Sequence, residues 1–285
     1  MKKSVYISNF LLILLAFSCG QNSSEKELIG NWREIENEYS TWHFYPDSLV
    51  FKLSGTTENK TDWKANKSQI EFEIETYDRN SVGKFVDTIN KIKIDYQLSN
   101  KRDSLFGILK NNYGVHKFSM LKTENYIEYL NRKFGMEFTL PKNDSNELER
   151  VDPVYGMKIF MNLENDNVVA KTELSNSLNN LETDIKEFKN KLESYFGTYD
   201  LRTERFYLSV YADKQVPDSM ITANLAVRIK SNFFLNNKYD AITIPRPPGD
   251  TLPINIYRIY ESDENKNLEF RKAKKIKTIA NTVYN

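Results

Sequence analysis

Few residues of this 285-residue sequence are of types that do chemistry by themselves. There is one cysteine, Cys19, and there are two histidines, His43 and His116, which lie far apart in segments that alternate like strands. A metal site needs several ligands at fixed spacing, and no His-x-x-x-His pattern or cysteine cluster occurs. A nucleophile elbow, a phosphate-binding glycine loop and a dinucleotide fingerprint are also missing from the sequence. We therefore expect no metal, no cofactor and no catalytic residues, and the 39 acidic side chains are interpreted as solvated.

Cys19 follows a segment that is typical of export. Lys2 and Lys3 precede an apolar run over residues 10–17, as in a signal peptide, and this run is far shorter than the roughly 20 residues of a membrane span. Residues 15–20 (LAFSCG) resemble the lipobox of bacterial lipoproteins, although Phe17 is bulkier than the usual residue. The resemblance implies that signal peptide 1–18 is removed and that Cys19 is acylated. The alternative is an ordinary signal peptide that ends near a cysteine.

Removal of residues 1–18 would change the formal net charge from +1 to −1, because it takes away two lysines and no acid. That balance gives no reason to expect a nucleic acid partner. Polar residues 19–27 predict a tether between the lipid and the fold. Gly20 after the cysteine favours transit to the outer membrane, so we expect a Gram-negative envelope lipoprotein on the periplasmic face.

Residues 28–121 predict a small β domain, because short period-two alternations are separated by turns rich in Asn, Asp, Gly and Ser. Such a pattern is typical of an antiparallel barrel or sandwich. Residues 28–32 (LIGNW) resemble the Gly-x-Trp opening of lipocalin-like domains, and Trp63 follows in a fitting place. The resemblance implies that Gly30 lets the chain turn and that Trp32 plugs one end of the barrel. Lining of a small apolar ligand by Trp32 and Trp63 is the second interpretation, because the short domain favours a filled interior.

Residues 122–153 predict a linker with a short helix, which begins at Thr123 and ends before Gly135. Residues 154–262 then predict the order β-β-α-β-α-β, a sheet covered by two helices. Its first helix has an apolar stripe at steps of three and four, and its second begins after Pro217 with Asp218 as the cap. The last strand is predicted at 240–244, and residues 263–285 are predicted to be a basic C-terminal tail.

Residues 211–217 (YADKQVP) carry a second resemblance. A strand ending in Ala-Asp, followed by Val-Pro and a helix, is similar to the periplasmic domain of the ExbD/TolR biopolymer-transport family, over about residues 155–246. The resemblance makes Asp213, Val216 and Pro217 the motif of an interaction domain. Members of that family use a transmembrane helix with an acidic residue for proton coupling, which this chain replaces with an anchor and a β domain. From the residues alone, Asp213 is interpreted as a turn residue that accepts backbone N–H bonds.

These patterns predict an α+β protein with a lipocalin-like β domain and an ExbD/TolR-like α+β domain. The function that we expect is a non-enzymatic envelope lipoprotein, a binding or scaffolding module that takes an envelope protein or a second copy of itself as partner. The alternative is a carrier of a small apolar ligand in the β domain, and an enzyme ranks third.

Overall fold

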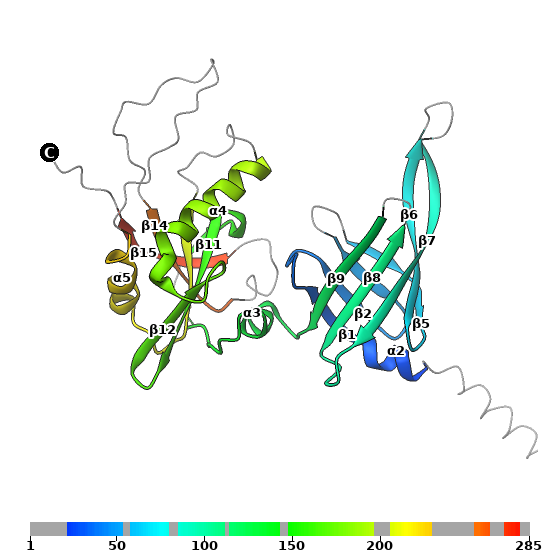
Figure 1. The fold of residues 1–285 in the computed structure, drawn as a ribbon, viewed down its shortest axis with the longest axis horizontal. Helices are drawn as coiled ribbons and strands as arrows, with labels where there is room; N and C mark the ends of the chain where they lie inside the picture. The colour runs from blue at the N-terminus through cyan, green and yellow to red at the C-terminus, as the bar shows by residue number, and fades with distance from the viewer. Residues whose placement is uncertain are drawn as a thin grey trace, which may run out of the picture. The chain divides into compact units, whose positions relative to one another are not determined.

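The computed structural model describes residues 22–53, 58–79, 85–111, 114–142, 148–196, 206–229, 254–262 and 271–279. The chain divides into two compact units, Met1–Tyr129 and Leu130–Asn285 (Figure 1). The first unit is a nearly closed antiparallel barrel-like sheet, and the second is a mixed sheet with a few helices. No helix among the residues described has the length and apolar character needed to cross a membrane.

A short helix, α2 (Ser23–Leu28), begins where a flexible tether was predicted over residues 19–27. Asn22 caps this helix: its side chain accepts from the backbone N–H groups of Ser24 and Glu25, and the Glu25 carboxylate accepts from Asn22 N–H in return. The Asn22 amide also donates to the Ala65 carbonyl at 2.7 Å, and Leu28 is fully buried. The prediction of a tether was therefore wrong from Asn22 onwards, because the polar sequence satisfies the helix terminus and docks it on the barrel.

Nine strands make up the described sheet of the first unit, in the order β4-β3-β2-β1-β9-β8-β7-β6-β5. Consecutive strands other than β4 and β5 pair antiparallel, as the hairpin-sized turns of the sequence require, and β1 pairs with β9 to bring the two ends of the segment together. The strands are β1 Gly30–Glu34, β2 Thr41–Phe44, β3 Leu49–Lys52, β4 Asn59–Thr61, β5 Trp63–Ala65, β6 Gln69–Arg79, β7 Phe85–Leu98, β8 Ser104–Asn111 and β9 Gly114–Lys122.

The two edge strands β4 and β5 are consecutive in the chain, with only Asp62 between them. β4 pairs with β3 and β5 pairs with β6, so one extended segment changes partners and nearly closes the barrel. Along a strand, alternate side chains point inward, which explains the alternation of apolar and polar residues in the sequence. The buried inward residues form one aromatic-rich cluster, which includes Trp32, Trp42, Phe44, Leu49, Phe51, Ile70, Phe72, Ile94, Tyr96, Leu105, Phe118 and Met120.

Helix α3 (Tyr126–Phe134) confirms the predicted helix, with a later start. Asn125, rather than Thr123, occupies the capping position, since its side chain accepts from the Glu128 N–H at 3.0 Å. Gly135 follows the last helical residue with φ = +58°, the left-handed conformation that ends helices. The sequence therefore located the end of the helix correctly and placed its beginning too early.

Six strands make up the described sheet of the second unit, in the order β10-β15-β14-β13-β11-β12. β11, β13 and β14 are parallel neighbours, while β12 and β15 run antiparallel to their partners. The bounds are β10 Glu149–Val151, β11 Gly156–Glu164, β12 Asn167–Thr172, α4 Leu181–Phe196, β13 Tyr207–Ala212, α5 Asp218–Ala226, β14 Ile254–Ile259 and β15 Arg271–Ile279, with 3₁₀ turns at Pro153–Tyr155 and Leu178–Asn180.

One face of this sheet and the helices α4 and α5 share a hydrophobic core. The predicted stripe is confirmed, because Leu178, Leu181, Ile185, Phe188 and Leu192 are all buried in it. From β11 to β14 the elements follow the predicted order β-β-α-β-α-β, but the last strand lies at 254–259. The strand predicted at 240–244 falls outside the described residues.

Two strands occupy segments that were predicted to lie outside the sheet. β10 forms within the predicted linker 122–153, and β15 forms within the predicted basic tail 263–285, where it pairs with both β10 and β14. Arg271 and Ala273 on β15 are fully buried, whereas Lys275 and Lys277 are exposed. The lysine-rich segment is therefore a paired strand that is buried at its beginning and exposed further on, and the tail prediction was wrong for 271–279.

Candidate functional site

The predicted lipid attachment residue, Cys19, lies outside the described residues, and the described chain begins three positions later at Asn22. The segment following Asn22 is folded onto the barrel through α2. Any anchor at Cys19 would be separated from folded structure by Gly20 and Gln21 alone.

Gly30 and Trp32 lie on β1, directly after α2. Gly30 has φ = +129°, a backbone conformation that favours glycine, and an added Cβ would lie 2.7 Å from the end of the flexible Lys122 side chain, which would have to shift. The Trp32 indole N–H donates to the Leu28 carbonyl at 2.7 Å, and the ring is 1% exposed. Lys122 lies over this ring at 5.5 Å, and burial lowers the pKa of its ammonium group. Trp32 is therefore a buried core residue of the barrel that bonds to the last residue of α2.

Trp63 belongs to the aromatic packing of the barrel. Its ring meets Phe44 edge-on at 4.7 Å, and its indole N–H donates to the Tyr45 carbonyl at 2.9 Å. Deeper in the cluster, Phe118 covers Gly107 so closely that an added Cβ would lie 2.2 Å from the ring. Trp63 and Phe118 therefore both take part in the aromatic packing of the described interior.

The predicted interaction motif forms the connection between β13 and α5. The Asp213 carboxylate accepts from the Gln215 N–H at 2.9 Å and from the Thr139 N–H at 2.7 Å. Val216 is fully buried, and its N–H donates to the Asp213 carbonyl. Pro217 takes the N-cap position with no side-chain bond, so the prediction of Asp218 as the cap was wrong. The motif residues hold the turn and also fasten the segment around Thr139 to it.

Two buried arginines were not anticipated from the sequence. The Arg258 side chain, 6% exposed, forms an ion pair with Asp218 at 2.7 Å, and it donates to the Asp213 carbonyl at 3.0 Å. Arg271 is fully buried, and its Nε donates to the Tyr211 hydroxyl at 3.1 Å. Buried arginines are rare unless paired. The only available signal was alternation within β14 and β15, which the positive charges of 271–277 obscured.

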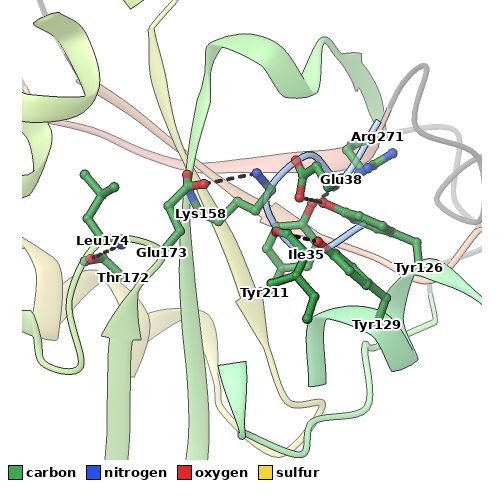
Figure 2. A network of polar contacts seen from close by, with 10 residues as sticks. All are labelled: Ile35, Glu38, Tyr126, Tyr129, Lys158, Thr172, Glu173, Leu174, Tyr211 and Arg271. Carbon is green, nitrogen blue, oxygen red and sulfur yellow. Dashed lines mark hydrogen bonds and ion pairs between the residues drawn. The ribbon is translucent and has the colours of Figure 1, made fainter. Parts of the chain in front are cut away.

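The sheet face opposite α4 and α5 carries polar side chains, of which Lys158, Tyr211 and Arg271 are among the residues drawn in Figure 2. The buried Lys158 ammonium pairs with the Glu173 carboxylate at 3.2 Å, and Glu173 also accepts from the Lys158 N–H at 2.7 Å. Nearby on β13, the Tyr207 hydroxyl donates to the Asp152 carbonyl, and burial raises its pKa. These groups satisfy one another, as buried polar groups must. A structural role accounts for them.

The edge strand β12 offers the clearest interaction feature of the second unit. It is the last strand in the sheet order, and it returns from β11 through Asn165 and Asp166, both with positive φ. That two-residue turn with positive φ at both positions is the I′ type that matches strand twist. Val169 on β12 is among the exposed large apolar side chains of the described residues.

The remaining candidates for chemistry stay apart. His43 lies on β2 and His116 lies on β9, so both histidines are in strands, as predicted. Burial lowers the pKa of the His43 imidazole. The described parts of the chain contain no group of three His, Cys, Asp or Glu residues that could hold a metal ion. Comparisons with family models, curated proteins and solved structures find no match to this chain. The two family resemblances therefore remain proposals.

Proposed function

We propose that the chain is a non-enzymatic cell-envelope lipoprotein, held on the outer membrane through Cys19, whose second unit binds a protein partner as a scaffold. The observation that carries the binding role is the open edge of β12 in the described sheet. The lipobox-like segment over residues 15–20 supports the anchor. Two acyl chains hold a protein on a membrane stably, whereas one chain is marginal.

The register of the β11–β12 hairpin determines which β12 groups face a partner. Glu164 and Asn167 flank the two-residue turn and form its hydrogen-bonded closing pair. By alternation, the backbone groups of Val169 bond to β11, while those of Val168 and Ala170 point to the open edge. Such an edge accepts a further strand through main-chain hydrogen bonds, and the neighbouring side chains supply the specificity.

The element order supports a relation to the ExbD/TolR family. A hairpin, a helix, a strand that ends in Ala212-Asp213 and a second helix after Pro217 follow one another as in that family's periplasmic domain. We infer a module accessory to an envelope transport complex. Because an anchor and a β domain stand where the family has its proton-coupling helix, the module binds without coupling to proton flow.

Cross-linking with mass spectrometry in intact cells tests the binding role. The expected result is a reproducible cross-link from the second unit to one envelope protein or to a second copy. Ala170→Pro removes an N–H at the edge and keeps the bonds to β11, so it should abolish the cross-link. Asn167→Ala, beside the turn, is the control that should retain it. If Ala170→Pro retained the cross-link, or if the wild-type chain gave no cross-linked partner, the result would contradict the proposal.

Membrane fractionation of Cys19→Ser tests the anchor separately. The wild-type chain should sediment with outer membranes, and the variant should be released to the soluble fraction. A variant that remains with the membranes to the same extent would show that Cys19 does not anchor the chain. The carrier of a small apolar ligand is not carried forward as a second proposal, because no observation on the described residues favours it over the packed aromatic cluster.

A further inference from the structure

At Asp62 the chain stops pairing with β3 and begins to pair with β6, and a cavity lies at this point of the barrel wall. β4 pairs with β3 up to Thr61, while β5 pairs with β6 from Trp63 opposite Phe72. Beyond Phe72, β6 continues to Arg79 and pairs only with β7 in the described sheet. The cavity, here called the seam cavity, has a volume of about 350 Å³. This volume lies near the lower end of the range of small-molecule sites, about 300–1,000 Å³.

Two aromatic side chains contribute to the lining, and the packing around them holds both rings. Trp63 is fixed by its hydrogen bond to the Tyr45 carbonyl and by its edge contact with Phe44. Phe72 is held by Trp42 at 5.7 Å and Phe51 at 5.3 Å between ring centroids. The aromatic part of the cavity is therefore pre-organised, and a ligand would not have to order it.

The polar part of the lining carries nearly balanced charge. Asp62, Glu71 and Glu73 supply three carboxylates, and Lys64 and Lys91 supply two ammonium groups. Glu71 is paired with Lys91 at 3.3 Å and with Lys64 at 3.8 Å. Hydrogen bonds from Lys93 and Lys91 lower the pKa of Glu71, so it is ionised at neutral pH. An apolar ligand would cover these charges without replacing their water, which is unfavourable.

We propose that the seam cavity binds a small uncharged saccharide. A sugar ring presents one apolar C–H face, which suits the half-buried ring of Trp63, while the buried Phe72 packs behind it in the core. Its hydroxyl groups both donate and accept, so they satisfy carboxylates such as Glu73 and ammonium groups such as Lys91 together. The three carboxylates and two ammonium groups of the lining leave a formal net charge of only −1, so the lining does not select a strongly charged ion. This site lies in the first unit and is independent of the edge of β12 proposed above.

Titration of the full-length chain in detergent with glucose, N-acetylglucosamine and cellobiose tests the site, with lauric acid as the apolar probe. Saturation-transfer NMR reports binding of the sugar. Quenching of tryptophan fluorescence by iodide reports where the sugar binds, because Trp32 and Trp42 are buried whereas Trp63 lines the cavity. We expect saturable binding of at least one sugar, with protection of Trp63 from iodide.

Glu73→Ala should weaken that binding about three- to tenfold, the effect of losing roughly one hydrogen bond to a ligand. Glu75→Ala is the matched control: it removes the same side chain two residues along the same strand, outside the lining, and should leave the affinity unchanged. Asp62→Ala provides a second test at an exposed position. Binding of no sugar, equal binding in all three variants, or saturable binding of lauric acid alone would each overturn the proposal.

Discussion

The ion pair between Arg258 and Asp218 predicts an unequal effect of removing either partner. The Arg258 side chain is 6% exposed and that of Asp218 is 38% exposed. Asp218→Asn therefore leaves a buried guanidinium that has lost its counter-charge and keeps its bond to the Asp213 carbonyl. Arg258→Met leaves a carboxylate that water can reach. The aspartate substitution should thus be the more harmful of the two.

The expected magnitudes follow from these environments. Removing one partner of a fully buried pair costs about 3–5 kcal/mol, and a hydrogen bond to a charged group contributes about 1.5–3 kcal/mol. Because Asp218 is partly solvated and Arg258 keeps one acceptor, we expect Asp218→Asn to cost about 2 kcal/mol. Arg258→Met should cost about 1 kcal/mol or less, since Arg258 Nε is buried without a bonding partner and its removal relieves that cost.

Urea unfolding, followed by hydrogen exchange of the amides in β13, α5 and β14, measures the free energy of unfolding of the second unit. The three tryptophans of the chain, Trp32, Trp42 and Trp63, all belong to the first unit, so tryptophan fluorescence is an internal control that should not shift. The double variant should resemble Arg258→Met, because no uncompensated guanidinium remains. A larger loss for Arg258→Met than for Asp218→Asn would refute this account of the pair.

Three further predictions concern the first unit and use its tryptophan fluorescence. Gly107→Ala forces a Cβ into the Phe118 ring and should destabilise the barrel by about 1–3 kcal/mol; an unchanged urea midpoint would contradict the packing described. Burial lowers the pKa of His43 from 6.5, so its contribution should be complete above pH 6.5 and lost as pH falls, and His43→Gln should flatten that dependence. Asn22→Ala removes the cap of α2 and the bond to Ala65, for a loss of about 1 kcal/mol, whereas a freely moving tether would show none.

Features set by local sequence were predictable. The stripe from Leu178 to Leu192, the stop at Gly135 and the turn around Asp213 depend on neighbours in the chain, and the structure has them where the sequence indicates. The role of Asp213 was only half visible, because its second donor, the Thr139 N–H, lies 74 positions away. No local pattern identifies such a contact.

Features decided by distant partners were missed. β15 is rich in lysine and was interpreted as a tail, yet β10 and β14 supply hydrogen bonds on both sides, and Arg271 and Ala273 face inward. Helix α2 has six residues, too few for a clear apolar period, and its stability comes from the cap and from Ala65. The seam cavity exists because the chain changes its strand partner at Asp62. That change depends on β3 and β6, so it cannot be read from the residues around Asp62.

The docking of α2 sets the reach of the protein. With lipid on Cys19, three Cα–Cα steps separate it from Asn22, a span of at most about 11 Å. That distance is about one Debye length at physiological ionic strength and only a fraction of the ~40 Å thickness of a bilayer. The barrel would then be held close to the lipid headgroups. Its partners would have to come to the membrane surface, and lengthening the span before Asn22 should change which neighbours it touches.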